Sequence, residues 1–291
     1  MKTPLFFLLA IFMGITACNN DRANSATKTV NNIPVENNGV HIDYTDTGKG
    51  DTTLLFVHGW CINKTYWDNQ VDCFNKNYRV VTIDLPGFGK SGKNRRDFNT
   101  TIYATDVNAI INQLHLNNVV LIGHSMSGDI ILQAAVTNAA KVIGIVGIDN
   151  FKSVGVQMTN EKQAEKEYAE AMAAMKKDFK SVAIPYFNDQ LFYKTTSAAV
   201  RQRIINDVKH ADTIVAVKAM VWDKFNEADK LITYGKKLYM LNSDYDPTDV
   251  SGLKTKHLPY DLTYIHATGH FPMVEKPNEF NKLLEGIIKR I

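Results

Sequence analysis

The sequence predicts an α/β fold with a mostly parallel central sheet flanked by helices, interrupted by an all-helical cap insertion. Six short runs are rich in Val, Ile and Leu, and their apolar residues are continuous rather than alternating, as in strands buried on both faces. Helical patterns lie between most of these runs, and this alternation favours a parallel sheet covered on both sides. The predicted strands span residues 52–57, 79–84, 118–123, 142–149, 237–242 and 262–267.

Composition excludes several classes of protein. The chain has 291 residues, of which 45% are apolar and 22% charged, so it can bury a sizeable core. Its 33 Lys and Arg nearly balance 30 Asp and Glu, and this gives no electrostatic indication of a nucleic-acid partner. Three cysteines are too few for a disulfide scaffold or a four-cysteine zinc site. No cluster of His, Cys, Asp and Glu has metal-ligand spacing, so we expect no metal.

The N-terminal region predicts export rather than fold. Lys2 precedes an apolar run at residues 5–15, which is too short to span a bilayer and suits the core of a signal peptide. Residues 15–18, Ile-Thr-Ala-Cys, resemble the lipobox of bacterial lipoproteins, which implies a signal peptide of residues 1–17 and acylation of Cys18. A plain secretory signal is the alternative. Residues 18–38 are rich in Asn, Thr and Ser, which predicts a flexible tether to a lipid anchor in the bacterial cell envelope, on the periplasmic or surface side of a membrane.

The most informative motif is Gly123-His124-Ser125-Met126-Ser127-Gly128, between a predicted strand and a helical pattern. A serine at the apex of a strand–turn–helix unit is typical of a nucleophile elbow. Such a turn needs small residues two before and two after the serine, and the following helix N-terminus favours developing negative charge. The motif resembles that of the α/β-hydrolase family, with Ser127 in place of the usual second glycine. Ser125 is therefore the predicted nucleophile, in a slightly strained turn.

Two further loops carry the same resemblance, which extends over residues 39–291. His58-Gly59-Trp60 ends the first predicted strand and matches the family's oxyanion loop, so the backbone amides of Trp60 and Met126 are the expected oxyanion donors. His58 itself is expected to be a structural turn residue rather than a base. Residues 84–91 also match a family loop and contain a glycine-rich turn that carries no chemistry.

The acid of the implied triad lies downstream of the serine in this family. Three candidates, Asp244, Asp246 and Asp249, follow the predicted strand 237–242. Asp246 best matches the family position and is the predicted acid, although Asp244 is too close to be excluded. A rarer family variant takes the acid from the preceding strand, where Asp149 stands, and the alternative for Asp149 is a helix cap or loop anchor.

His270 is the predicted general base. It lies in Gly269-His270-Phe271-Pro272, just past the last predicted strand, and this segment closely matches the catalytic-histidine loop of the family. His266 falls within that strand and is expected to be a packed histidine.

The cap is predicted over about residues 152–228, where no strong strand occurs. Apolar residues that include Met172 and Met175 recur there at helical spacing, which indicates a face packed on the main domain; a substrate-facing role is the alternative. Cys61 and Cys73 are expected to be buried free thiols, with a disulfide between them as the alternative.

The resemblance implies a serine hydrolase that cleaves a carboxylic ester with a small to medium, apolar acyl group through an acyl-enzyme, with Ser125, His270 and Asp246 as its triad. Such a mechanism needs no cofactor, and none is expected. Lactone, amide or C–C bond hydrolysis and cofactor-free perhydrolysis remain open, because the fold does not fix the reaction. A slow or non-catalytic ligand-binding sensor of the same fold is the alternative from another class. The expected partners are a small-molecule substrate and, through the lipid anchor, a membrane. The oligomeric state is not predicted.

Overall fold

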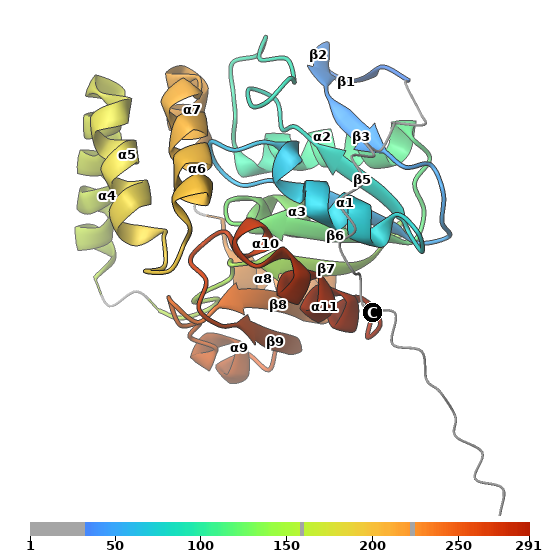
Figure 1. Ribbon diagram of the computed structural model, residues 1–291. Helices are drawn as coiled ribbons and strands as arrows, with labels where there is room; N and C mark the ends of the chain where they lie inside the picture. Colours follow the sequence, from blue (N-terminus) through green and yellow to red (C-terminus); the bar gives the residue numbers. More distant parts are fainter. Residues whose placement is uncertain (1–32, 158–159, 222–224) are drawn as a thin grey trace, which may run out of the picture.

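The computed structural model describes residues 33–157, 160–221 and 225–291, and a seven-stranded sheet lies at its centre (Figure 1). The strand order is β3-β5-β4-β6-β7-β8-β9, in which β3 is antiparallel to β5 and every other neighbouring pair is parallel. The predicted parallel sheet is therefore confirmed, and each predicted strand is present within two residues of its expected ends. The strands are β3 (Tyr44–Asp46), β4 (Thr53–Val57), β5 (Arg79–Ile83), β6 (Val119–His124), β7 (Val142–Ile148), β8 (Leu238–Ser243) and β9 (Tyr260–Ile265).

The N-terminal part of the described chain differs from the prediction. The tether was expected to extend to residue 38, but β1 (Val35–Asn37) already pairs antiparallel with β2 (Val40–Ile42) in a two-stranded hairpin. Val35 and Ile42 are fully buried, so the folded domain includes residues before 39. Strands of three residues are too short to show a periodic pattern, which is why β1 to β3 escaped prediction. The predicted signal peptide, Cys18 and most of the tether lie outside the described residues.

Helices cover both faces of the sheet (Figure 1). On one face lie α1 and α11, and on the other lie α2, α3 and α8, with α2 packed on α3 and α3 on α8. Short helices η1, α9 and α10 connect the strands and layers. Their bounds are η1 (Lys64–Trp67), α1 (Asp68–Phe74), α2 (Thr100–Gln113), α3 (Ser127–Thr137), α8 (Glu227–Tyr234), α9 (Ser251–Thr255), α10 (Pro272–Glu275) and α11 (Pro277–Ile288).

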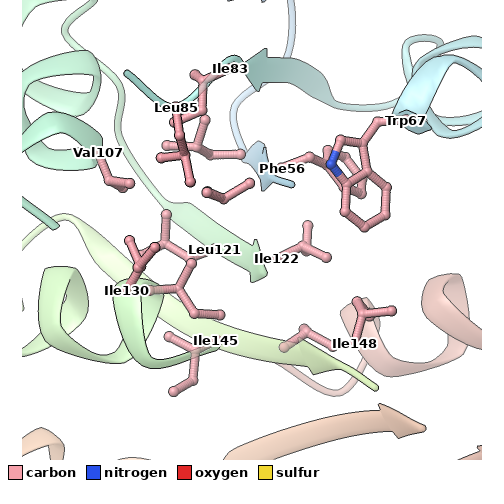
Figure 2. Packing of buried hydrophobic residues seen from close by; sticks show 14 of the residues in the cluster. Phe56, Trp67, Ile83, Leu85, Val107, Leu121, Ile122, Ile130, Ile145 and Ile148 are labelled. Atoms are coloured by element: carbon pink, nitrogen blue, oxygen red, sulfur yellow. The ribbon is translucent and has the colours of Figure 1, made fainter. Parts of the chain in front are cut away.

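The core is formed on both faces of the central strands, as continuous apolar runs require. All five residues of β4 are buried. Figure 2 shows Leu121 on the side of Val107 and Ile130, whereas Phe56 lies on the side of Trp67, with ring centroids 5.0 Å apart. Burial on both faces fixes the register of these strands, because a shift of one residue would exchange the two faces.

Four helices lie in the interval predicted for the cap and stand together beside the sheet (Figure 1): α4 (Glu161–Lys177), α5 (Phe179–Gln190), α6 (Ala198–His210) and α7 (Thr213–Ala219). Met172 and Met175 are the buried residues of α4, and neither lines the cavity described below, which favours the packing role expected for this face. Phe179 packs edge-on against Trp60 of the main domain, with ring centroids 5.6 Å apart. Across the described residues, every helix is too short or too polar to cross a membrane.

Candidate active site

Three loops at the carboxyl edge of the sheet bring the candidate residues together. Ser125 follows β6, Asp149 follows β7 and His270 follows β9, so parallel strands deliver all three to the same edge. The Oγ of Ser125 lies 2.8 Å from Nε2 of His270, and the Nδ1 of His270 lies 2.6 Å from Oδ2 of Asp149. A hydroxyl, an imidazole and a carboxylate in series can activate a serine for nucleophilic attack.

The turn at Ser125 has the strained conformation predicted for a nucleophile elbow. Its φ is +53°, in the left-handed region that non-glycine residues rarely adopt. The Ser125 N–H donates to the carbonyl of Ile148 at 3.0 Å, and the Gly128 N–H closes the turn onto the Ser125 carbonyl at 2.9 Å. A Cβ on Gly123 would lie 2.4 Å from the carbonyl oxygen of Ser127, so only glycine fits there. The turn thus holds the Ser125 hydroxyl toward His270.

Ser127, the one departure from the usual motif, is accommodated by a hydrogen bond. Its side chain is fully buried, and its hydroxyl donates to the backbone carbonyl of His58. A buried hydroxyl with a partner avoids the cost of leaving a polar group unsatisfied. The substitution therefore ties the nucleophile turn to the loop after β4 instead of disrupting it.

The acid that contacts His270 is Asp149, and this corrects the prediction of Asp246. Asp149 is 6% exposed, has a φ of +46° and takes the carboxylate position beside the imidazole. Asp246 is exposed, and its backbone carbonyl rather than its carboxylate contacts a neighbour, Lys152. The spacing of Asp246 resembled the family pattern, but the left-handed turn after β7 points the Asp149 side chain at the histidine.

The other two acids after β8 are engaged elsewhere. Asp244 accepts from Nδ1 of His266 at 2.6 Å, and both side chains are exposed, so the expectation of a packed His266 is wrong. Asp249 accepts the Ser251 N–H at 2.8 Å and begins the turn into α9. Neither carboxylate contacts His270.

Electrostatics keep Asp149 ionised. Burial alone would raise the pKa of this carboxyl, but the hydrogen bond and charge of His270 and the ammonium of Lys152 outweigh it and lower the pKa to about 2. The Nζ of Lys152 lies 2.7 Å from Oδ1 of Asp149, and the Ser243 N–H donates to the same oxygen at 3.0 Å. Both oxygens of the carboxylate are therefore held in place.

His124 holds the loop of His270 through a hydrogen bond and a ring contact. Its Nε2 lies 2.7 Å from the backbone carbonyl of His270, and the two rings pack with centroids 4.8 Å apart. Burial and the adjacent His270 lower the pKa of His124 to about 3, so it is neutral and donates through Nε2–H. From the cap, the carbonyl of Leu191 accepts the His270 N–H at 2.8 Å. The loop of His270 is thus held both by the main domain, through His124, and by the cap, through Leu191.

A cavity of about 310 Å³ opens at Ser125 and His270. Trp60 and Met126, the predicted oxyanion donors, both line it, and among the described residues neither amide N–H donates to a backbone carbonyl. Trp60 is also held by the cap, because its Nε1–H donates to the carbonyl of Ala216 at 2.9 Å. Most of the remaining wall is apolar: Tyr186, Phe187, Leu191, Met220, Phe225 and Phe271.

Two carboxyl groups in the same cavity wall were not foreseen. Asp129, in the first turn of α3, and Glu227, at the start of α8, are hydrogen-bonded to each other. Burial raises the pKa of Glu227, and the hydrogen bond with Asp129 acts in the opposite direction. A carboxyl–carboxyl hydrogen bond needs a proton on one partner, so this wall is polar and acidic. The sequence did not indicate this acidic pair. Acidic residues in the first turn of a helix are common because they interact favourably with the helix dipole, so neither residue suggested a site.

Several other predicted residues have structural positions. His58 is fully buried, with Nδ1 2.8 Å from the Gly59 carbonyl and Nε2 accepting the Leu85 N–H at 2.9 Å, as expected for a turn residue. Cys61 is a buried free thiol, as expected, and does not pair with Cys73. The same expectation is wrong for Cys73, which is half-buried and is not a free thiol. Over the described ranges, no three His, Cys, Asp or Glu side chains are grouped to hold a metal ion.

The chain was compared with protein families and with known proteins. Residues 52–250 match the family described as the alpha/beta hydrolase fold. A 2-hydroxy-6-oxononadienedioate/2-hydroxy-6-oxononatrienedioate hydrolase of Burkholderia vietnamiensis is 34% identical over 113 residues, which are 36% of this chain and 38% of that protein. A non-heme chloroperoxidase of Streptomyces lividans is 38% identical over 92 residues, which are 31% of this chain and 33% of the relative. The chain thus spans little more than a third of the length of these curated relatives.

Among solved structures, a thermophilic esterase from Thermogutta terrifontis superimposes with a TM-score of 0.75. The superposition covers 89% of this chain and 97% of the esterase, at 18% sequence identity. A likeness at this identity concerns the fold.

Proposed function

Because the chain belongs to the α/β-hydrolase family of enzymes, we propose that it is a serine hydrolase that cleaves a carboxylic ester through an acyl-enzyme. The single observation that carries this proposal is the unbroken series of contacts from Ser125 Oγ through His270 to Asp149, at 2.8 and 2.6 Å. These distances are within hydrogen-bond reach for proton transfer. The series begins at a strained turn that opens into a cavity.

In the proposed mechanism, Ser125 Oγ attacks the ester carbonyl carbon while His270 Nε2 takes the hydroxyl proton. Asp149 orients the imidazole through Nδ1–H and stabilises the imidazolium that forms. The N–H groups of Trp60 and Met126 stabilise the negative oxygen of the tetrahedral intermediate. His270 then protonates the leaving alcohol, and a water molecule, deprotonated by the same imidazole, releases the acid from Ser125.

The cavity supports an acyl group of small to medium size. Its volume of about 310 Å³ lies at the lower end of the range for small-molecule sites, and most of its wall is apolar. The hydrogen-bonded Asp129 and Glu227 disfavour a substrate that places a carboxylate against this wall. We therefore expect neutral acyl chains to react faster than chains ending in a carboxylate.

Cofactor-free perhydrolysis is the second candidate, on the strength of the similarity to a non-heme chloroperoxidase. Hydrogen peroxide would replace water in the second step, so the same acyl-enzyme would release a peracid. Adding peroxide to the ester assay and following halide oxidation separates the two reactions.

The decisive experiment measures Ser125-dependent turnover. The purified full chain and its Ser125→Ala variant are assayed with nitrophenyl esters from acetyl to octanoyl and with a nitrophenyl hemisuccinate, following both burst and steady state. We expect Ser125→Ala to lower kcat by at least ~10³. A folded wild-type protein that neither turns over these esters nor reacts with a fluorophosphonate would contradict the proposal.

We also propose that the protein is held in the bacterial cell envelope by a lipid on Cys18. The support is the Ile-Thr-Ala-Cys segment after a short apolar run, followed by a polar stretch that can act as a tether. Growth with an alkyne fatty acid tests this: wild type should carry the label and sediment with membranes, whereas Cys18→Ser should do neither.

A further inference from the structure

Lys152 is the only cation among the described residues that contacts the acid of the site. It lies in the turn after β7, three residues beyond Asp149, and its Nζ is 2.7 Å from Oδ1 of that carboxylate. The same ammonium donates to the backbone carbonyls of Asp246 at 2.6 Å and Ser243 at 3.2 Å. One side chain therefore joins the acid to the loop after the neighbouring strand, β8.

The two oxygens of Asp149 face different partners. Oδ2 accepts from His270, whereas Oδ1 accepts from Lys152 and from the Ser243 N–H. The Lys152 side chain is 21% exposed and that of Asp149 is 5% exposed, so the ion pair is largely shielded from solvent. A pair in such surroundings is screened less than a surface pair.

We propose that Lys152 is a positioning residue of the active site, which fixes the orientation of Asp149 and offsets part of its negative charge. This inference rests on the proposed function. Lys152 does not touch the reacting atoms; it acts through Asp149 on His270. Because it also donates to the carbonyls of Ser243, at the end of β8, and Asp246, in the loop that follows, it couples the geometry of the acid to that loop.

The charge of Lys152 has a consequence that a purely structural role lacks. The ionisable groups that influence Asp149 are His270, Lys152, the neutral His124 and the phenol of Tyr186. The cation opposes protonation of His270, while the carboxylate favours it. Removing the cation leaves the negative charge of Asp149 unopposed, so we expect the acid limb of the rate profile to move to higher pH.

The test follows the pH dependence of Ser125 labelling by a fluorophosphonate, a reaction that needs the neutral imidazole but no particular substrate. Lys152→Met is compared with Lys152→Arg, which keeps the charge, and with Lys236→Met as the matched control. Lys236 donates to the Val142 carbonyl at the opposite end of β7, 2.7 Å away, so it is a lysine bonded to the same strand but remote from the site.

For Lys152→Met we expect the midpoint of the acid limb to rise by about 0.5 to 1 pH unit and the plateau rate to fall on the order of tenfold. Lys152→Arg should keep the wild-type midpoint with a smaller loss of rate. The guanidinium keeps the positive charge, but its planar shape cannot reproduce all the bonds of the compact ammonium. Lys236→Met should match wild type in both. The low-field proton resonance of the His270 Nδ1–H should shift in Lys152→Met only, and thermal melting confirms that each variant is folded.

The experiment distinguishes failure of the Lys152 role from failure of the proposed hydrolase function. One outcome is that the fluorophosphonate labels wild type, while Lys152→Met keeps the wild-type midpoint and the wild-type resonance. That result would overturn the positioning role of Lys152 but not the proposed hydrolase function. A midpoint that moves equally in Lys152→Arg would overturn the charge argument. Wild type that never labels would overturn the proposed function and this inference with it.

Discussion

The turns after β7 and β8 lie side by side at the same edge of the sheet, and each contributes acidic residues. Asp149 after β7 is 6% exposed and contacts His270, whereas Asp246 after β8 is exposed and presents only its backbone carbonyl to the site. Asn242, near the end of β8, joins the two turns: it exchanges hydrogen bonds with the backbone N–H and carbonyl of Asn150 and donates to Thr248 in the turn after β8. The turn after β7 thus supplies the carboxylate that contacts His270, and the end of β8 with its turn supplies bonds that hold the β7 turn in place.

The environment of a turn, rather than its place in the chain, decides which acid contacts the histidine. Asp149 has a left-handed φ of +46°, a backbone donor from Ser243 and a cation from Lys152. A buried carboxylate needs such partners to remain ionised. An exposed carboxylate such as that of Asp246 is solvated by water and needs none.

The largest expected effect that separates the two turns is the loss of the Asp149 charge. Asp149→Asn should lower kcat by ~10³–10⁴, because a neutral amide neither stabilises the imidazolium nor holds the correct tautomer of His270. Steady-state kinetics with the best nitrophenyl ester measures the effect. A variant within tenfold of wild type would remove Asp149 from the mechanism.

The scaffold role of the β8 turn is tested by removing Asn242. This side chain is fully buried, and its amide donates to the Asn150 carbonyl at 2.9 Å and to Thr248 Oγ1 at 2.9 Å. Asn242→Ala should lower the free energy of unfolding by about 2 to 3 kcal/mol, since it leaves buried polar groups without partners. Urea denaturation measures the change.

The matched control for that substitution is Asn188→Ala on α5, where the amide is exposed and donates to the Ile184 carbonyl at 3.1 Å. Its expected change is within about 0.5 kcal/mol. Equal losses in the two variants would show that the β8 turn has no special scaffold role.

The charge of Asp149 should also appear in the pH dependence of stability. Its pKa of about 2 in the folded chain lies below the value of about 3.9 in an unfolded one. The folded state therefore binds the proton less readily, and the ionised carboxylate contributes about 2 kcal/mol that is present above roughly pH 4 and lost as the pH falls toward 2. The difference in free energy of unfolding between wild type and Asp149→Asn should shrink over that interval, measured by urea denaturation at successive pH values. A constant difference from pH 6 to pH 2 would contradict the lowered pKa.

Much of the fold and part of the site follow from sequence, for physical reasons. Six strands were predictable because burial on both faces demands continuous apolar runs. Ser125 and His270 were predictable because each lies in a flanking pattern that its chemistry requires: small residues around a strained turn for Ser125, and Gly-His-Phe-Pro after the last strand for His270. The three-residue strands β1 to β3 carry no period and were missed.

The acid and its lysine could not be selected in the same way. Asp149-Asn150 after a strand is typical of a helix cap or loop anchor, whereas Asp246-Pro247 matched the family position. The two acids differ in backbone angle and burial, and in two long-range bonds: the Ser243 N–H donates to the Asp149 carboxylate, and Lys152 donates to the Asp246 carbonyl. Each of these bonds joins residues 94 positions apart. Such contacts leave no periodic or local signal, so Lys152 had none at all.

Loss of the Asp246 charge should have little effect on catalysis. Asp246→Asn should change kcat/KM by less than about threefold, because an exposed carboxylate is solvated and Lys152 bonds the backbone carbonyl of Asp246, which the substitution preserves. The same kinetics, run beside Asp149→Asn, measure it. Asp244→Asn serves as a second control, since the exposed Asp244 carboxylate accepts from the exposed His266 and not from His270. A thousandfold loss in Asp246→Asn, with Asp149→Asn active, would return the acid to the β8 turn and show that the two loops exchange roles in solution. A loss confined to Asp149→Asn would establish that the chain takes its acid from the strand next to the nucleophile, in the turn that Lys152 holds.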